Sequence, residues 1–152
     1  MRGSCRIQLA FLLCYSSIAF SGWEESAVTL QKNLVDQGFE NVQVSGDNNG
    51  LVRVRYENRV YRNEVRAAGV VLAEINRCDS TWSESVLLPL HRQVVIAEIG
   101  VGMADYRAFR AGSIGANELA ARLQFSAGES KSEGFLYTTG PTNSSLRRFD
   151  VT

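Results

Sequence analysis

Apolar and polar side chains alternate along residues 51–57, LVRVRYE. A period of two is typical of a strand with one buried face. The period changes at Tyr61, after which apolar residues recur at spacings of three and four, as they do on one face of a helix. The apolar positions on this face are Tyr61, Val65, Ala68, Leu72 and Ile75. The pattern predicts a strand followed by a helix from about Tyr61 to Arg77, and the rest of the chain is expected to complete their core.

The residues before this unit predict another helix and another strand. Apolar residues recur at helical spacing within residues 25–37, with Ser26 as the expected N-cap and Gly38 as the expected stop. Residues 41–44 then alternate as a short strand. Residues 45–50 are rich in Gly and Asn, which tolerate positive φ, and they therefore predict a hairpin turn.

A second hairpin is predicted from residues 84–91 and 93–101, both rich in Val, Leu and Ile. Pro89 cannot donate to a strand ladder, so the first of these strands is expected at an edge, or with a bulge at that position. Gly69, inside the predicted helix, favours a close contact between helix and sheet. The residues expected to face the core are Val95, Ala97, Ile99 and Val101, with Val86, Leu88 and Leu90 packed beside them.

The predicted order of elements is helix–hairpin–helix–hairpin, so an αββ unit occurs twice as a weak structural repeat. Two short helices are expected to follow, over residues 104–111 and 115–123. We expect an α+β fold in which two αββ units form a small antiparallel sheet packed on helices, with short C-terminal helices added.

The two ends of the chain differ in composition from this central part. Residues 1–21 combine two arginines with an apolar run too short to span a bilayer and end in small residues, as in a secretory signal peptide. The small, polar residues 126–134 are typical of a linker, and alternation resumes beyond them. The expected organisation is a signal peptide at 1–21, an α+β domain at 22–125, a linker at 126–134, and at 135–152 either the start of a truncated β region or a disordered tail.

Charge and cysteine usage narrow the classes of function. The chain has 16 basic and 16 acidic residues, and without Arg2 and Arg6 of the signal segment 14 basic residues remain against 16 acidic ones. A chain so close to neutral is not expected to bind nucleic acid.

Two of the three cysteines fall in the signal segment, so Cys78 has no partner for an internal disulfide in the exported domain. We interpret it as a buried or incidental thiol.

No spacing of residues predicts catalysis or a cofactor. The single histidine, His91, has no Cys, Asp or Glu beside it at metal-ligand spacing. The serines lack the Gly-x-Ser-x-Gly and Ser-x-x-Lys patterns, and the Gly-x-Gly at residues 100–102 lacks the rest of a dinucleotide fingerprint. Glu57, Glu64 and Glu74 are too scattered to predict a carboxylate pair. We therefore expect a protein that is not an enzyme and has no cofactor or metal.

The one suggestive constellation is cationic. Five arginines lie close together in sequence, with Tyr56 and Tyr61 interleaved. Forked guanidinium groups beside aromatic rings suit an anionic sugar chain or a lipid headgroup. The alternative is a solvated face, because acidic residues of the same segment offer neutralising partners and surface ion pairs contribute little. The candidate anion- or glycan-binding residues are Arg53, Arg55, Arg59, Arg62 and Arg66.

Three stretches of the chain carry a family resemblance. They are LVDQGFENVQV at 34–44, LVRVRYENRVYRNEVRAAGVVL at 51–72, and VVIAEIGVGMADYRAFRAGSIGANELAARL at 94–123. Together they resemble the periplasmic N-terminal part of YjbH-type proteins of bacterial exopolysaccharide biosynthesis and export systems. Residues 148–151, RFDV, also resemble the point where that family enters a long outer-membrane β-barrel region. The resemblance covers about residues 30–152.

The resemblance implies a non-enzymatic module of an exopolysaccharide biosynthesis and export system. Such a module would be exported to the periplasm of a Gram-negative bacterium and associated with the outer membrane. Its implied partners are other exopolysaccharide-export or outer-membrane proteins, and polysaccharide itself is a further candidate. A membrane would be reached only through the barrel region, which is missing because 152 residues cannot supply its many strands. Two alternatives stay open: a freestanding periplasmic adaptor or binding domain unrelated to polysaccharide, and a truncated, non-functional fragment of a barrel protein.

Overall fold

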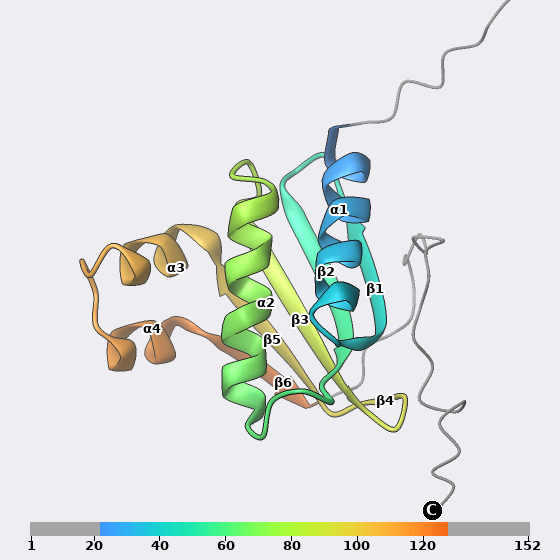
Figure 1. The fold of residues 1–152 in the computed structure, drawn as a ribbon. Helices are drawn as coiled ribbons and strands as arrows, with labels where there is room; N and C mark the ends of the chain where they lie inside the picture. Colours follow the sequence, from blue (N-terminus) through green and yellow to red (C-terminus); the bar gives the residue numbers. More distant parts are fainter. Residues whose placement is uncertain (1–21, 128–152) are drawn as a thin grey trace, which may run out of the picture.

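The computed structural model describes residues 22–127, which form an α+β structure with helices packed on a sheet (Figure 1). The elements are α1 Gly22–Asp36, β1 Glu40–Gly46, β2 Leu51–Glu57, α2 Glu64–Cys78, β3 Glu84–His91, β4 Val94–Val95, β5 Ala97–Gly102, α3 Met103–Arg110, α4 Ala116–Arg122 and β6 Gln124–Ala127. This order confirms the predicted α+β class, with two successive αββ units followed by short helices.

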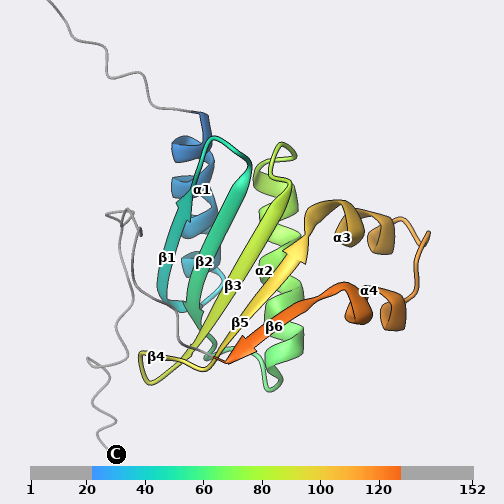
Figure 2. The ribbon, with the colours of Figure 1, turned by 180° about the vertical axis from the view of Figure 1, so that it is seen from behind.

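The strands form one mixed sheet. Its order is β1-β2-β3-β5-β6, and the short β4 pairs with β3. Figures 1 and 2 show α1 and α2 side by side on one face of this sheet, which we call the helix face. Within residues 22–127 no helix lies on the opposite face, which we call the second face, and α3 and α4 lie beyond the β5–β6 side.

One pairing differs from the predicted antiparallel sheet. β2 and β3 run parallel, with Leu51 beside Glu84 and Glu57 beside Leu90, while every other strand pair is antiparallel. Parallel neighbours need a crossover, and α2 supplies it by carrying the chain from the end of β2 back to the start of β3. The starts of β2 and β3 therefore meet at the same end of the sheet.

The core lies between the helix face of the sheet and the two long helices. Val52, Val54 and Tyr56 of β2 are fully buried, as their alternation predicts. The buried residues of α2 are Ala67, Val71, Leu72 and Ile75.

The structure corrects two predictions about α2, where the helix begins and which of its residues face the core. The helix begins at Glu64 rather than near Tyr61, because the side chain of Asn63 accepts hydrogen bonds from the N–H groups of Val65 and Arg66 and acts as the N-cap. Val65 was expected in the core but is 81% exposed. Gly69 is also exposed, and nothing lies within 4 Å of the position its Cβ would take, so the predicted close helix–sheet contact is wrong.

Helix α1 begins earlier than predicted and ends where predicted. Its first residue is Gly22, which places Ser26 inside the helix rather than at the N-cap. At its end, Gly38 has a φ of +92°, and the N–H groups of Gly38 and Phe39 bond back to carbonyls of the last turn. These two bonds form a Schellman motif, which confirms Gly38 as the stop.

Strand β3 is central rather than at an edge. The predicted irregularity at Pro89 is confirmed, because β5 pairs with β3 only as far as Leu87 and β4 takes over at Leu90. Leu87 belongs to the core under the helices. Val86 and Leu88 alternate to the second face, so the prediction that they pack with the core residues of β5 is wrong.

The C-terminal part of the described chain contains one element that was not predicted. Helices α3 and α4 match the two predicted short helices, and Gly112, with a φ of +76°, follows α3. Strand β6 then pairs with β5 and takes in residues 126–127 of the predicted linker. The predicted signal peptide at 1–21, the rest of the linker and the predicted tail lie outside the described residues.

Candidate functional site

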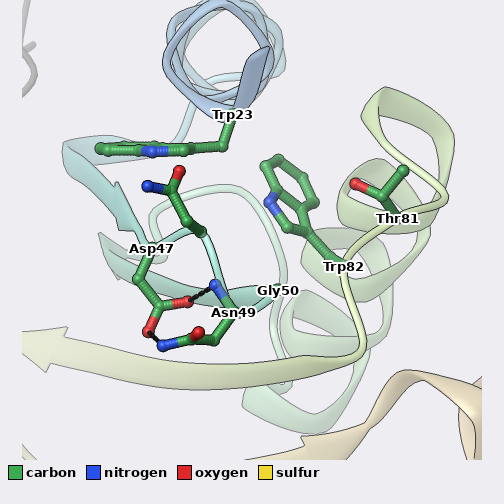
Figure 3. A pocket seen from close by; sticks show the side chains of 7 residues that line it. Trp23, Asp47, Asn49, Gly50, Thr81 and Trp82 are labelled. Carbon is green, nitrogen blue, oxygen red and sulfur yellow. Dashed lines mark hydrogen bonds between the residues drawn. The ribbon is translucent and has the colours of Figure 1, made fainter. Parts of the chain in front are cut away.

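A pocket of about 280 Å³ opens at the end of the sheet where β2 and β3 begin (Figure 3). Three segments far apart in sequence form it: the first turn of α1, the β1–β2 loop, and the loop between α2 and β3. We call it the tryptophan pocket. Its lining residues are Trp23, Asp47, Asn48, Asn49, Gly50, Thr81 and Trp82.

The β1–β2 loop is shaped by the carboxylate of Asp47. Its Oδ1 accepts hydrogen bonds from the backbone N–H of Leu51 at 3.0 Å and from that of Asn49 at 2.9 Å. The bond from Leu51 is the main reason why the pKa of Asp47 lies below its ordinary value. The loop is therefore held by an ionised carboxylate at neutral pH, and Oδ2 has only a long 3.5 Å contact from Asn49 Nδ2.

Gly50 joins the β1–β2 loop to the α2–β3 loop. Its carbonyl accepts hydrogen bonds from the backbone N–H of Ser83 at 2.9 Å and from that of Glu84 at 3.2 Å. Gly50 has a φ of +86°, and a Cβ there would lie 2.9 Å from Ser83 Oγ. Only glycine fits this position without strain, so the two walls of the pocket are fixed to each other.

Trp23 forms the aromatic wall of the pocket. Figure 3 shows one face of its indole turned toward the loop that carries Asp47 and Asn49. The ring also lies against β1, because a Cβ on Gly46 would be 3.0 Å from Trp23 Cε3. The indole is thus held by close packing rather than by a hydrogen bond of its own.

Trp82 forms the opposite wall and has an unusual environment. The residue is 1% exposed, and its indole Nε1 has no hydrogen-bond partner. Figure 3 shows this nitrogen on the ring edge turned toward the side of Trp23 and Asp47. A buried donor without an acceptor is uncommon in native proteins. Glu40 Oε2 and the Tyr56 hydroxyl share this lack, but neither residue lines this pocket, whereas Trp82 does, so we take its N–H as the mark of a candidate site.

Arg107 of α3 holds the loop that carries Trp82. Its Nη2 donates to the backbone carbonyl oxygens of Ser80 at 2.9 Å and Trp82 at 2.7 Å. Its Nε donates to Asn76 Oδ1 at 3.0 Å. Helix α3 therefore positions the second wall of the pocket.

A smaller hollow of about 180 Å³ adjoins the tryptophan pocket through Asp47. It is lined by residues of β1 and the start of β2, including Ser45 and Arg53. Arg53 lies close enough to Asp47 to contribute to lowering its pKa. This hollow connects the loop end of the sheet with the second face.

The structure brings two of the five predicted arginines together. Arg53 and Arg55 lie on the second face of β2, two residues apart, beside Val86 and Leu88 of β3. The Arg55 guanidinium donates from Nη1 to Gln43 Oε1 at 3.1 Å across the β1–β2 pair. These two side chains are the part of the predicted site that shares one surface.

The other three arginines are placed elsewhere. Arg59 lies in the turn after β2 and is paired with two carboxylates, those of Glu57 at 3.2 Å and Glu40 at 3.6 Å. Arg62 and Arg66 are exposed near the start of α2, and the Arg66 guanidinium carbon lies 5.6 Å from the ring centre of Tyr61.

The tyrosines do not form the predicted stacking platform between the arginines. Tyr56 is fully buried, and burial, followed by the nearby Glu64 carboxylate, raises the pKa of its hydroxyl. Tyr61 packs against the core and contacts the ring of Phe39 at a centroid distance of 5.7 Å.

A buried carboxylate was not predicted from the sequence. Glu57, 2% exposed, accepts a hydrogen bond at Oε2 from Asn41 Nδ2 at 2.7 Å and one at Oε1 from the backbone N–H of Arg92 at 3.2 Å. With Arg59 it ties β1, the turn after β2 and the β3–β4 turn together. We interpret this cluster as structural, because its main polar groups bond to one another.

The described residues assemble no group that indicates nucleophilic or metal chemistry. Within residues 22–127 no three His, Cys, Asp or Glu side chains gather in a way that would hold a metal ion. Cys78 is half-buried, and burial raises the pKa of its thiol, to which Asn33 donates a hydrogen bond at 3.5 Å. His91 is exposed at the end of β3.

Within residues 22–127, no helix has both the length and the apolar character needed to cross a bilayer.

The sequence prediction missed both tryptophans as site residues. Trp82 lies between the predicted second helix and the predicted second hairpin, Trp23 lies before the predicted first helix, and neither was named as a candidate. A signal was present, because each is a large aromatic residue at the border of a polar segment, and the Asp-Asn-Asn-Gly run at 47–50 is rich in hydrogen-bonding side chains.

Comparison with known proteins finds no matching family model, no matching curated protein and no matching solved structure. The interpretation of the site therefore depends on its own geometry.

Proposed function

We propose that this chain is a non-enzymatic, exported module of an exopolysaccharide biosynthesis and export system of a Gram-negative bacterium. In this proposal it works in the periplasm, next to the outer membrane, by contacting an acidic polymer during its export and the other proteins of that system. The observation that carries the proposal is the placement of Arg53 and Arg55 together on the second face of the sheet.

Two arginines on one face of a strand suit a repeating anion. Residues i and i+2 of a strand are separated by roughly 7 Å along the strand, and the sheet holds both stems in a fixed register. Guanidinium groups bind carboxylates through forked hydrogen bonds, which gives geometric selectivity as well as charge. A polymer with acidic substituents could meet both cations at once, whereas a single small anion would meet one.

The family resemblance supplies the second line of support. Its segments include β2 and the start of α2, where the arginines occur, and they imply polysaccharide export rather than another envelope function. The geometry supports anion contact, and the resemblance connects that contact with a polymer.

The proposal is tested by a clean deletion followed by complementation. We expect deletion to reduce the amount of secreted polymer per cell, the wild-type gene to restore it, and the double variant Arg53→Gln/Arg55→Gln to fail to restore it. The matched control is Arg62→Gln/Arg66→Gln, which removes two cations from the same segment but from a different surface, and which should restore secretion. Normal polymer secretion after clean deletion would refute the proposal, and a defect in another envelope function would favour a periplasmic adaptor unrelated to polysaccharide.

A further inference from the structure

We propose that the tryptophan pocket binds one neutral pyranose unit of a saccharide, with the sugar ring stacked on Trp23 and a sugar oxygen accepting the hydrogen bond of Trp82 Nε1. This site is separate from the Arg53–Arg55 surface. It does not rest on the proposed function, because its residues differ and its test is binding in solution.

The aromatic wall provides the stacking surface. One face of a pyranose ring presents C–H groups, and a flat indole offers them a large apolar contact area with little loss of side-chain entropy. Figure 3 shows the indole of Trp23 with its face turned toward the polar loop, so a ring placed against it would direct its hydroxyl groups at Asp47 and Asn49.

The unpaired indole N–H of Trp82 provides the second, independent argument. Burying a donor without an acceptor is unfavourable, and the N–H edge is turned toward the space between the two walls. The nitrogen has almost no exposed surface, so a neighbouring side chain of the pocket must move before a ligand oxygen can accept this bond. Once formed, the bond removes the penalty, so an oxygen-rich ligand gains more here than an apolar one of the same shape.

The same orientation argues against a quaternary ammonium group at the Trp82 wall, so that a cation would have only the face of Trp23 to contact. A quaternary ammonium group is held by the negative faces of aromatic rings. Trp82 instead presents its N–H edge, which carries positive charge density and repels a cation. The pocket therefore fits a hydroxyl or ether oxygen at this position, not an ammonium group.

The polar groups of the pocket match sugar hydroxyls. Asp47 Oδ1 is used by two backbone N–H groups, while Oδ2 has only the 3.5 Å contact and keeps its capacity to accept. The side chains of Asn48 and Asn49 are exposed. The Thr81 hydroxyl, which also lines the pocket, already donates to Asp79 Oδ1 at 2.6 Å. The β1–β2 loop therefore supplies both an acceptor, Asp47 Oδ2, and amide groups beside the aromatic surface.

The size of the pocket limits the ligand to one ring. Its volume of about 280 Å³ lies just below the usual range of small-molecule pockets, which is roughly 300–1,000 Å³. A single pyranose fits such a space, and neighbouring units of a longer glycan would extend into solvent.

The test is a titration of the full exported chain, labelled with ¹⁵N, with methyl glycosides of glucose, galactose and mannose. The chain has two tryptophans, so its spectrum holds two indole N–H resonances, which the Trp23→Phe variant assigns. We expect at least one glycoside, at millimolar concentrations, to move the Trp82 indole resonance in a saturable way. Trp23→Ala should weaken this binding about tenfold or more, and Asn49→Ala should weaken it with the fold unchanged.

A matched control removes an aromatic ring elsewhere. Phe125 of β6 is 66% exposed and lies outside the pocket, so Phe125→Ala should leave the affinity within about twofold. If no glycoside moves the Trp82 resonance, or if tetramethylammonium moves it at lower concentration than any glycoside, the assignment is overturned. Loss of glycoside binding in Trp23→Ala supports this site whether or not that variant secretes polymer normally, because the proposed function is tested separately by deletion and by the Arg53→Gln/Arg55→Gln variant.

Discussion

Replacing Glu57 by alanine tests whether the buried carboxylate holds the far end of the sheet together. The substitution removes the acceptor for Asn41 Nδ2 and for the backbone N–H of Arg92, and it removes the ion-pair partner of Arg59. Three separate segments lose their common contact. We expect a large loss of stability with no change of fold.

The expected magnitude follows from the environment of each partner. Hydrogen bonds to a charged group contribute about 1.5–3 kcal/mol each, and the two from Asn41 and Arg92 are made to a residue that is 2% exposed. The side chain of Arg59 is 46% exposed, so water solvates it after the change and its pair is counted as a surface pair of about 0–1 kcal/mol. The free energy of unfolding should therefore fall by at least about 3 kcal/mol, which is the lower end of this sum.

The assay is equilibrium urea denaturation followed by the fluorescence of the two tryptophans. The matched control is Glu118→Ala on α4, where the carboxylate is 50% exposed and paired with Arg122. The control should lower the free energy of unfolding by less than about 0.5 kcal/mol, and the slope against urea should be the same in both variants. If Glu57→Ala costs no more than Glu118→Ala, the cluster does not stabilise the fold and the argument from burial fails.

Three further predictions concern local structure. Gly69→Ala should raise the free energy of unfolding by about 0.5–1 kcal/mol, because the position is exposed within α2 and nothing lies near the added methyl group; a lower thermal midpoint would contradict this. Asn63→Ala should lower it by about 1 kcal/mol through loss of the N-cap, while Asn63→Asp should retain it, as measured by urea denaturation. The N–H groups of Leu51 and Asn49 lower the pKa of Asp47 below 3.8, so the stability they provide is present above that pH and lost as the pH falls through the folded-state pKa. Asp47→Asn should therefore show a smaller loss of urea midpoint below about pH 4 than the wild type, and equal losses would contradict the assignment.

The sequence predicts where the helices and strands lie better than it predicts which strands pair with each other. The alternation of β2 and the stop at Gly38 depend on local chemistry, and both are confirmed. The parallel pairing of β2 with β3 was missed, because a hydrophobic pattern shows which face is buried but not which strand lies beside it. One local signal was available: the nearly continuous apolar run of β3, residues 86–90, is typical of a strand buried on both faces.

The arginine cluster shows why nearness in sequence does not predict a site. Strand alternation sends Arg53 and Arg55 to the second face and Tyr56 into the core. The chain turns after β2, and Arg59 there forms ion pairs with the carboxylates of Glu57 and Glu40. The tryptophan pocket has the opposite character, because its residues come from positions 23, 47–50 and 81–82 and meet only in the folded chain.

The parallel pairing of β2 and β3 explains where a ligand site can form. It places the β1–β2 loop and the α2–β3 loop at one end of the sheet, next to the start of α1, and it places the turn after β2 and the β3–β4 turn at the other end. At the end with the β3–β4 turn, Glu57 is bonded to Asn41, Arg92 and Arg59, which come from three different segments. At the first end Gly50 and Arg107 fix the loops, yet the indole N–H of Trp82 stays without a partner. Near Glu57, the Glu40 Oε2 oxygen and the Tyr56 hydroxyl also lack a hydrogen-bond partner, so an unpaired buried group does not by itself mark a site. At the end with the tryptophan pocket, the unpaired group is a donor that lines a hollow beside an aromatic wall and exposed polar side chains, and this combination is why we place the saccharide there.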